Sequence, residues 1–289
     1  MTGSPEKNIA AGKVRDVVGT TSGMPASDGD GVSLTRIVGS PQLEMVDPFL
    51  MLDAFGSDRP GDYIGGFPDH PHRGFETVTY LLAGRMRHKD NAGHEGVIEP
   101  GGIQWMTAGR GIVHSEMPEQ EDGLLAGFQL WVNLPAAQKM TKPSYQEFPA
   151  SQVPVEKLDG GGEIRVITGR TDGGTVGPVK NVATDPIYLD VHLNEGGLFT
   201  QSMKASHAGF LYVIDGEVTV TGGDGVGAGM LGLLGPGDRV EVVAGAADTR
   251  FLMIAGHPLN EPVARGGPFV MNTRQEVMQA FRDFQSGRF

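Results

Sequence analysis

The apolar positions of this chain fall in short segments rich in β-branched residues, and turn residues separate these segments at close spacing. Residues 76–84 (ETVTYLLAG) and residues 209–216 (GFLYVIDG) are two such segments, and each ends in glycine. Short runs of this kind are typical of the strands of a sandwich or barrel, whereas a βαβ fold places helical patterns between its strands. We therefore predict an all-β protein.

The two segments begin similar series. In each, a second strand, a Gly-rich turn and a third strand follow, and a Pro-Gly turn ends the series at Pro100 or Pro236. Tyr80 and Tyr212 occupy the same place in their segments. Such an internal repeat indicates two similar β units in tandem. Residues 134–150 (LPAAQKMTKPSYQEFPA) contain three prolines and little periodicity, so we expect a linker here, with one domain over residues 1–140 and the other over 141–289.

Only residues 273–287 (TRQEVMQAFRDFQSG) break the β pattern. Thr273 and Glu276 have the spacing of a capping box, and Gly287 is a suitable stop. Val277, Phe281 and Phe284 share one helical face. We expect a short C-terminal amphipathic helix that packs on a barrel.

The composition excludes some classes of function. A net charge of −12 argues against direct binding to nucleic acid or to an anionic membrane surface. The chain has no cysteine, so disulfides, thiolate nucleophiles and sulfur ligands are excluded. Neither a signal peptide nor an apolar run of membrane-spanning length is visible, and we expect a cytoplasmic protein.

Four residues of metal-ligand type occur in two spaced pairs. His70 and His72 lie in FPDHPHRG, and His114 and Glu116 lie in GRGIVHSEMP. In a strand, residues i and i+2 point to the same face, so each pair should project together. One His pair alone is weak evidence, because hydrogen-bonded surface histidines give the same pattern. If the two strands are neighbours, all four side chains converge.

Three imidazoles and one carboxylate suit a borderline first-row divalent ion, whereas Ca²⁺ and Mg²⁺ prefer oxygen ligands. Four protein ligands on an octahedral ion leave two positions for water, dioxygen or substrate, which is an arrangement for chemistry rather than for a closed structural site. Because metal-binding imidazoles must be neutral, activity should fall in acid.

The chain resembles the cupin superfamily, and within it the pirin family. The stretch from Phe67, FPDHPHRGFETV, fits the first cupin motif only loosely, because one residue more than the motif allows separates Glu76 from Gly84. Trp105 holds the position of the histidine in the second motif. Pirins instead take two ligands from a later His-x-Glu, which HSEMP supplies at His114. Four further segments are similar to pirins: DPFLMLDAFG, QWMTAGRGIVHSEMP, FQLWVNLP and PVARGGPFVMNTR.

The resemblance implies two tandem cupin (jelly-roll) β-barrels, a bicupin, with iron in the N-terminal barrel and no metal in the C-terminal barrel. His70, His72, His114 and Glu116 would be the metal ligands. Fe(II) is the expected cofactor, and the same donors accept Mn, Co, Ni, Cu or Zn.

Bacterial pirin-like proteins are associated with quercetin 2,3-dioxygenase activity, which cleaves a flavonol ring and releases carbon monoxide. The resemblance thus implies a metal-dependent oxidoreductase acting on a small aromatic substrate and dioxygen. Glu116 would be catalytic, because it could take the proton of the flavonol 3-hydroxyl. The alternative, implied by eukaryotic pirins, is an iron-dependent redox-sensing regulator with protein partners. A degenerate cupin is a third interpretation, which the intact ligand set disfavours. We expect a monomer.

The remaining polar candidates have structural interpretations. Glu76 is four residues after His72, so in one continuous strand the two side chains would point to the same face. Glu76 is then either a further ligand or hydrogen-bond acceptor at the metal, or a salt-bridge partner of Arg73 or Arg110. We prefer the salt bridge. His88 and His94 lie in the polar turn RHKDNAGHE and are expected to be solvated, with a weak adventitious metal site as the alternative.

Other residues carry weaker signals. The second unit contains His192 and His207 but no His-x-His, and Glu241 stands where a second cupin motif would have histidine. The sequence does not separate barrel core from pocket wall among four large apolar residues, Trp105, Met106, Phe128 and Trp131.

Overall fold

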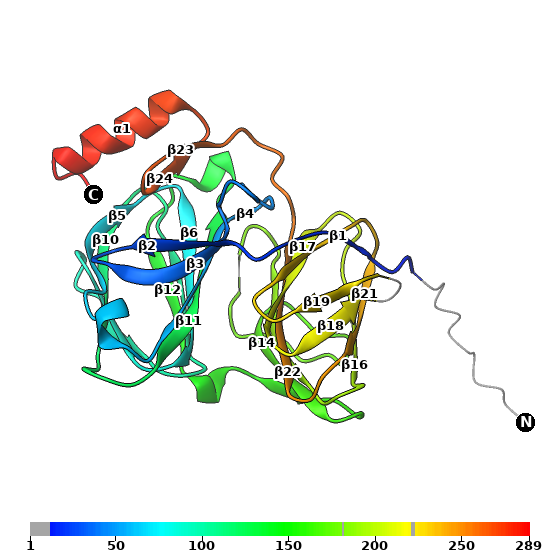
Figure 1. Ribbon diagram of the computed structural model, residues 1–289. Coiled ribbons are helices and arrows are strands. Elements are labelled where there is room, and N and C mark those ends of the chain that lie inside the picture. Colours follow the sequence, from blue (N-terminus) through cyan, green and yellow to red (C-terminus); the bar gives the residue numbers. More distant parts are fainter. Residues whose placement is uncertain (1–11, 181, 221–222) are drawn as a thin grey trace, which may run out of the picture.

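Four main β-sheets form the fold in the computed structural model, which describes residues 12–180, 182–220 and 223–289. They build two lobes, which lie side by side in Figure 1. Each lobe pairs a seven-stranded sheet with a four-stranded sheet.

The first lobe has a large sheet of order β12-β9-β6-β11-β4-β3-β2 and a small sheet of order β5-β10-β7-β8. The large sheet consists of β2 (Met24–Asp28), β3 (Val32–Val38), β4 (Phe49–Ser57), β6 (Phe75–Ala83), β9 (Ile103–Thr107), β11 (Leu125–Asn133) and β12 (Ser144–Phe148). The small sheet consists of β5 (Phe67–His72), β7 (Met86–Asp90), β8 (Glu95–Ile98) and β10 (Ile112–Pro118).

The second lobe has a large sheet of order β1-β20-β17-β22-β15-β14-β13 and a small sheet of order β16-β21-β18-β19. Its large sheet consists of β1 (Val17–Thr21), β13 (Val155–Lys157), β14 (Gly162–Thr168), β15 (Ile187–Leu193), β17 (Ala208–Asp215), β20 (Leu231–Leu234) and β22 (Thr249–Gly256). Its small sheet consists of β16 (Leu198–Ser202), β18 (Glu217–Val220), β19 (Gly225–Gly227) and β21 (Arg239–Ala244). Three 3₁₀ turns lie at Pro60–Asp62, Ala136–Gln138 and Ala150–Gln152.

The two lobes repeat one strand order, as the internal repeat predicts. Strand β6 occupies the same place in the first large sheet as β17 in the second, so Tyr80 and Tyr212 are topologically equivalent. Likewise β10, which carries His114 and Glu116, corresponds to β21. Each lobe is a two-layered sandwich whose sheets remain separate and are not closed into a barrel.

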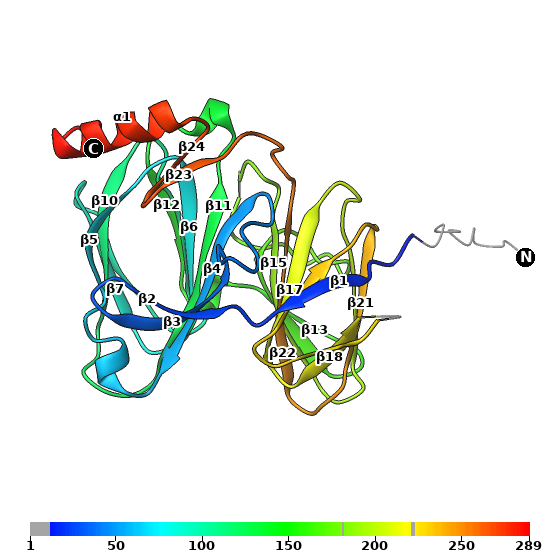
Figure 2. The same cartoon turned by 45° about the horizontal axis from the view of Figure 1, so that its top comes forward.

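In each large sheet, one edge strand lies on the other side of the expected division at residue 140 from the rest of the sheet. Strand β1 pairs with β20 of the second lobe, and the chain then crosses to β2 in the first lobe (Figures 1 and 2). Strand β12 pairs with β9 of the first lobe. Part of the expected linker, residues 134–150, is therefore a strand. A division near residue 140 stays a prediction, and two strand pairings cross it, that of β1 with β20 and that of β12 with β9.

The two large sheets pack on each other through a shared apolar core. Residues of both lobes meet there, as in the edge-on contacts of Phe49 with Phe210 and of Phe128 with Tyr212. The interior of the second lobe is also apolar, with Leu189, Val213 and other aliphatic side chains in it. The interior of the first lobe is different, because polar side chains line it.

The C-terminal segment returns to the first lobe. Strands β23 (Ala264–Gly266) and β24 (Phe269–Met271) form a hairpin, and α1 (Arg274–Gln285) lies over this lobe in both views (Figures 1 and 2). Both hydrogen bonds of the Thr273–Glu276 capping box are present, so the predicted helix start is confirmed. Phe281 contacts Phe269 of the hairpin. Within the described residues, no helix is long and apolar enough to cross a membrane.

Candidate metal centre

The two strands that carry the paired ligand residues are neighbours. Strands β5 and β10 run antiparallel, and His70 lies directly opposite His114. Because alternate residues share a face, His72 projects to the same side as His70. The register shifts between His114 and Glu116, so Glu116 pairs with Phe67. The strand arrangement thus brings three imidazoles into the interior of the first lobe.

The three rings form a close cluster. The ring centroids lie 4.7 Å apart for His70 and His72, 4.4 Å for His70 and His114, and 5.0 Å for His72 and His114. One nitrogen from each ring can be chosen so that all three lie within 4.8 Å of one another. This spacing is compatible with one ion bound by three imidazoles.

The protonation state of the cluster favours metal binding. Burial lowers the pKa of both His72 and His114 well below the usual value, and the charge of His70 acts in the same direction. Both rings are therefore neutral near pH 7, the state in which imidazole binds a metal. The Nδ1 atom of His72 and both ring nitrogens of His114 are buried and have no hydrogen-bond partner among the described residues. Unpartnered buried nitrogens are costly unless a ligand engages them.

The third imidazole, His70, is oriented by the backbone. Its Nδ1 lies 2.8 Å from the carbonyl oxygen of Pro68. A carbonyl only accepts, so Nδ1 carries the proton and Nε2 keeps a free lone pair. Metal-bound histidines commonly make such a bond through their other nitrogen.

Glu116 lies beside this cluster but is not part of it. Its carboxylate is buried, and Oε1 accepts a hydrogen bond of 2.7 Å from the Thr79 hydroxyl. The same hydroxyl lies 2.7 Å from the side-chain oxygen position of Gln129. One hydroxyl proton cannot serve two acceptors, so the Gln129 amide is best turned to donate to Thr79. Thr79 and Gln129 are thus contacts of the site that the ligand pattern does not indicate, and Glu116 as fourth ligand stays a prediction.

A small cavity adjoins Glu116. Its volume is about 50 Å³, and it is lined by Asp28, Leu34, Met51, Asp53, Phe55, Phe67, Glu116, Gln129 and Trp131. Trp131 also contacts His72, with ring centroids 5.2 Å apart. Arg36 bridges the two aspartates of the wall, at 2.9 Å from Asp28 and 2.7 Å from Asp53. The cavity therefore lies among the outer strands β2, β3 and β4, the ligand strands β5 and β10, and β11.

The four large apolar residues that the sequence does not assign to core or pocket lie in different surroundings. Trp131 points toward the histidine cluster, whereas Trp105 and Phe128 belong to the core between the lobes. Met106 packs with Ala108 and Ile112. Only Trp131 among these four contacts a proposed ligand or lines the cavity.

Glu76 does not form the predicted salt bridge. Its carboxylate accepts a hydrogen bond of 2.6 Å from Thr107, and burial raises its pKa to about 7. The expectation that Glu76 points to the same face as His72 is wrong, because Gly74, with φ +90°, separates the two strands. Within β6, Glu76 points to the same face as Val78, which lies in the core between the lobes.

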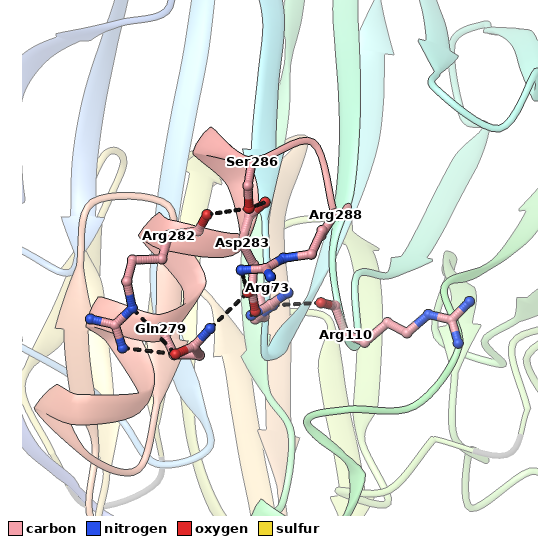
Figure 3. Close-up of polar contacts among 7 residues, drawn as sticks. All are labelled: Arg73, Arg110, Gln279, Arg282, Asp283, Ser286 and Arg288. Atoms are coloured by element: carbon pink, nitrogen blue, oxygen red, sulfur yellow. Dashed lines mark hydrogen bonds and ion pairs between the residues drawn. The ribbon is translucent and has the colours of Figure 1, made fainter.

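The expected partner of Glu76, Arg73, is instead tied to the C-terminal helix (Figure 3). Arg73 follows His72, and its buried guanidinium lies 2.8 Å from the carboxylate of Asp283. It also donates to the carbonyl of Arg110 and lies 4.3 Å from the ring centre of Phe289. Helix α1 thus holds the end of the ligand strand β5.

The remaining histidines differ from expectation at one position. His88 is buried, so its interpretation as a solvated hairpin residue is wrong, whereas His94 is exposed. Both face Glu147. In the second lobe, His192 lies 3.5 Å from Asp190, and the rings of His207 and His257 lie 6.3 Å apart.

Comparison with known proteins identifies the family. The Pirin family model matches residues 31–132, and the Pirin C-terminal cupin domain matches residues 188–289. This chain belongs to the pirin family. A pirin-like protein of Caulobacter vibrioides is 57% identical over 276 residues, 96% of this chain and 99% of that protein. A Pseudomonas aeruginosa protein provisionally named quercetin 2,3-dioxygenase is 48% identical over 279 residues, 95% of this chain and 98% of that protein.

A solved structure is similar over the same extent. Quercetin 2,3-dioxygenase from Acinetobacter baumannii aligns with a TM-score of 0.88 and 33% identity, covering 96% of this chain and 99% of that one. The predicted pirin fold, with two tandem cupin-type units and a C-terminal helix, is confirmed.

Proposed function

We propose that this pirin is a metal-dependent dioxygenase that cleaves flavonols such as quercetin. The observation that carries the proposal is the cluster of His70, His72 and His114, with its buried, unpartnered nitrogens beside a cavity. The names of the Pseudomonas and Acinetobacter relatives support the reaction class.

In this proposal the three histidines and Glu116 hold the metal, with Fe(II) as the first candidate and Mn, Co, Ni, Cu or Zn as alternatives. A metal held by these residues would supply Lewis-acid polarisation of a substrate oxygen and proximity to dioxygen. Glu116 accepts the proton of the flavonol 3-hydroxyl. Thr79, which now donates to Glu116, would keep that carboxylate aimed at the cavity.

The size of the cavity sets a condition on this function. About 50 Å³ accommodates dioxygen or a water or two, since a water takes roughly 30 Å³ in the liquid. A flavonol needs several times more room, so a wall must move. Strand β2 is the best candidate, because it is the edge strand of its sheet and is largely exposed. Its Asp28 lines the cavity and is held by Arg36.

The direct test is carbon monoxide release from quercetin. The protein is loaded with Fe(II) under nitrogen and then exposed to oxygen, and His72→Ala is compared with His257→Ala, which removes an exposed histidine of the second lobe. We expect iron-dependent product from the parent and from His257→Ala, and at least about 100-fold less from His72→Ala. Absence of product from fully iron-loaded parent protein would refute the dioxygenase proposal.

The role of Glu116 has its own test. Glu116→Gln keeps the shape of the side chain but removes the base, so kcat for quercetin cleavage should fall about 100-fold. Bound iron is measured in the same samples to separate loss of metal from loss of the base. Full turnover in Glu116→Gln would exclude the base role, and Glu121→Gln, in the exposed turn before β11, is the control.

The small cavity also favours one alternative, an iron-dependent redox-sensing regulator with protein partners. A closed site could exchange electrons without admitting a large substrate. The test is a pull-down with Fe(II)-loaded and Fe(III)-loaded protein. Identical partners in both oxidation states would remove the redox switch from consideration.

A further inference from the structure

A second group of metal-ligand residues lies next to the candidate metal centre in the first lobe. His88 is on β7, Glu147 is on β12, and His94 lies in the turn between β7 and β8. One donor atom from each of the three side chains lies within 4.8 Å of the other two. None of the three is among the predicted ligands of the first site.

The two imidazoles converge on one carboxylate oxygen of Glu147. Oε1 of Glu147 lies 2.8 Å from Nε2 of His88 and 3.3 Å from Nε2 of His94. His88 is buried, and its Nδ1 has no hydrogen-bond partner among the described residues. Every polar contact of this imidazole that the structure shows is therefore directed at Glu147.

The surroundings fix each ligand in place. The Asp90 carboxylate accepts from the backbone N–H groups of Ala92 and His94, both at 2.8 Å, and so holds the turn that presents His94. The ring of Tyr145 stacks on His94 at 4.5 Å. Gln104 donates to Glu147 at 2.7 Å. The site is thus held by neighbours before any ion binds, as metal sites usually are.

The spacing fits a tetrahedral ion. For metal–nitrogen bonds of about 2.0–2.1 Å, neighbouring ligand atoms of a tetrahedron lie roughly 3.3–3.4 Å apart. The contact between His94 and Glu147 already has this length, and the contact between His88 and Glu147 needs to open by about 0.5 Å.

We propose that His88, His94 and Glu147 form a second metal site, which binds a divalent ion of the zinc class and leaves one position open to water. Two imidazoles and one carboxylate with an open position are a donor set that zinc takes in catalytic sites. Ca²⁺ and Mg²⁺ are disfavoured, because they prefer oxygen donors.

All three proposed ligands line solvent-accessible pockets. His94 lines a surface pocket of about 460 Å³ with Tyr145 and Phe289, and His88 and Glu147 line another of about 260 Å³. An ion can therefore reach the site without opening the lobe. The two sites lie on adjacent strands, since His88 pairs directly with Glu116.

Metal stoichiometry tests the proposal independently of quercetin cleavage. The protein is stripped with a chelator and dialysed against micromolar Zn²⁺, and bound zinc is measured by elemental analysis. The parent should bind two equivalents. His94→Ala should bind one, because His94 is exposed and its loss threatens only the site. His72→Ala should also bind one, and His257→Ala should bind two.

Cobalt provides a second readout with the same variants. Four-coordinate Co²⁺ absorbs visible light much more strongly than six-coordinate Co²⁺, so the second equivalent should give an intense band. This band should vanish in His94→Ala and Glu147→Gln and should persist in His72→Ala. In His94→Ala and Glu147→Gln, the Kd for the second equivalent of Co²⁺ should be at least about 100-fold higher than in the parent. Parent stoichiometry in His94→Ala, or loss of all bound metal in His72→Ala, would overturn the proposal and leave a metal-free hydrogen-bond network.

Discussion

A single buried lysine holds three parts of the first lobe together. Nζ of Lys139 donates to the carbonyls of Gly74 and Val270 and to the side chain of Asn133, at 2.7, 3.0 and 2.6 Å. Gly74 follows the ligand strand, and Val270 belongs to β24. Burial lowers the pKa of Lys139 to about 8, so the side chain is still charged at pH 7, and its three N–H bonds match three acceptors.

We expect Lys139→Met to be destabilising. The substitution leaves three buried acceptors without a donor, so the free energy of unfolding at pH 7 should fall by about 3 kcal/mol. Urea unfolding measures this, and Lys180→Met, at an exposed position, should change little. Between about pH 8 and 10.5 the unfolded chain binds more protons at Lys139 than the folded protein does, so the parent should gain stability relative to the variant as the pH rises. A constant difference across this range would contradict the lowered pKa.

At this scale the sequence predicts the histidine cluster but not its neighbours. His-x-His and His-x-Glu in adjacent strands are a local pattern, and the strand period places them on one face. Thr79 and Gln129 carry a weaker signal, since each is a polar residue between apolar ones in a strand facing a polar interior. Lys139 carries none, because two of its three partners, the carbonyls of Gly74 and Val270, are distant in sequence. The prediction for Glu76 was wrong because it continued the alternation of side-chain directions through Gly74, where the chain passes from one sheet to the other.

At the scale of elements, the C-terminal helix docks on the ligand strand through one charged contact. Asp283 accepts from Arg73, Gln279 and Arg288, each within 2.8 Å (Figure 3). The Arg73 hydrogen bond is the main cause that lowers the pKa of Asp283 below its usual value. The contact thus stabilises docking fully above about pH 4 and loses strength as the pH falls below it.

Asp283→Asn should loosen this docking, because the buried guanidinium of Arg73 loses its counter-charge. Residues 274–289 should exchange their amide hydrogens faster at pH 7, whereas the strands of the second lobe should not change. Glu195→Gln, an exposed change far from the helix, is the control. At pH 3 the parent should approach the variant. Equal exchange rates in the helix at pH 7 would show that apolar contacts such as Phe281 with Phe269 suffice.

The presence of a helix was easier to predict from the sequence than the residues that the helix contacts. The capping box and the apolar face locate α1 in the sequence, because both are set by residues within one or two turns. The contact of the helix with Arg73 joins residues 210 positions apart, and no local pattern encodes such a contact.

At the scale of the whole molecule, the repeat predicts two similar β units in tandem, but it does not predict that β1 and β12 each join the other unit. The strand order is the same in both, which follows from duplicated local patterns. The assignment of β1 and β12 to opposite lobes depends on which sheet edge is free, a property of the assembled fold. One polar contact lies within the apolar core between the lobes: Tyr80 donates to Asp190 at 2.6 Å, and Arg250 lies 2.7 Å from the same carboxylate.

This buried contact should govern part of the acid stability of the molecule. Burial alone would raise the pKa of Asp190, but hydrogen bonds from His192 and Arg250 lower it below its usual range. Its stabilisation is therefore complete above about pH 4 and is lost as the pH falls further. Asp190→Asn should lower the free energy of unfolding at pH 7 by about 3 kcal/mol, since Arg250 keeps some solvent contact, and Tyr80→Phe by about 1 kcal/mol.

Urea unfolding from pH 7 to pH 2.5 separates this effect from a general loss of packing. The difference between the parent and Asp190→Asn should shrink below about pH 4, because the unfolded parent takes up a proton at Asp190 that the folded parent does not, which favours unfolding of the parent only. Asp58→Asn, at an exposed position, should follow the parent throughout. A difference that stays constant down to pH 2.5 would mean that the substitution acts through the shape of the core. In that case the apolar contacts of the two large sheets, rather than the Tyr80–Asp190–Arg250 network, would hold the lobes together in acid.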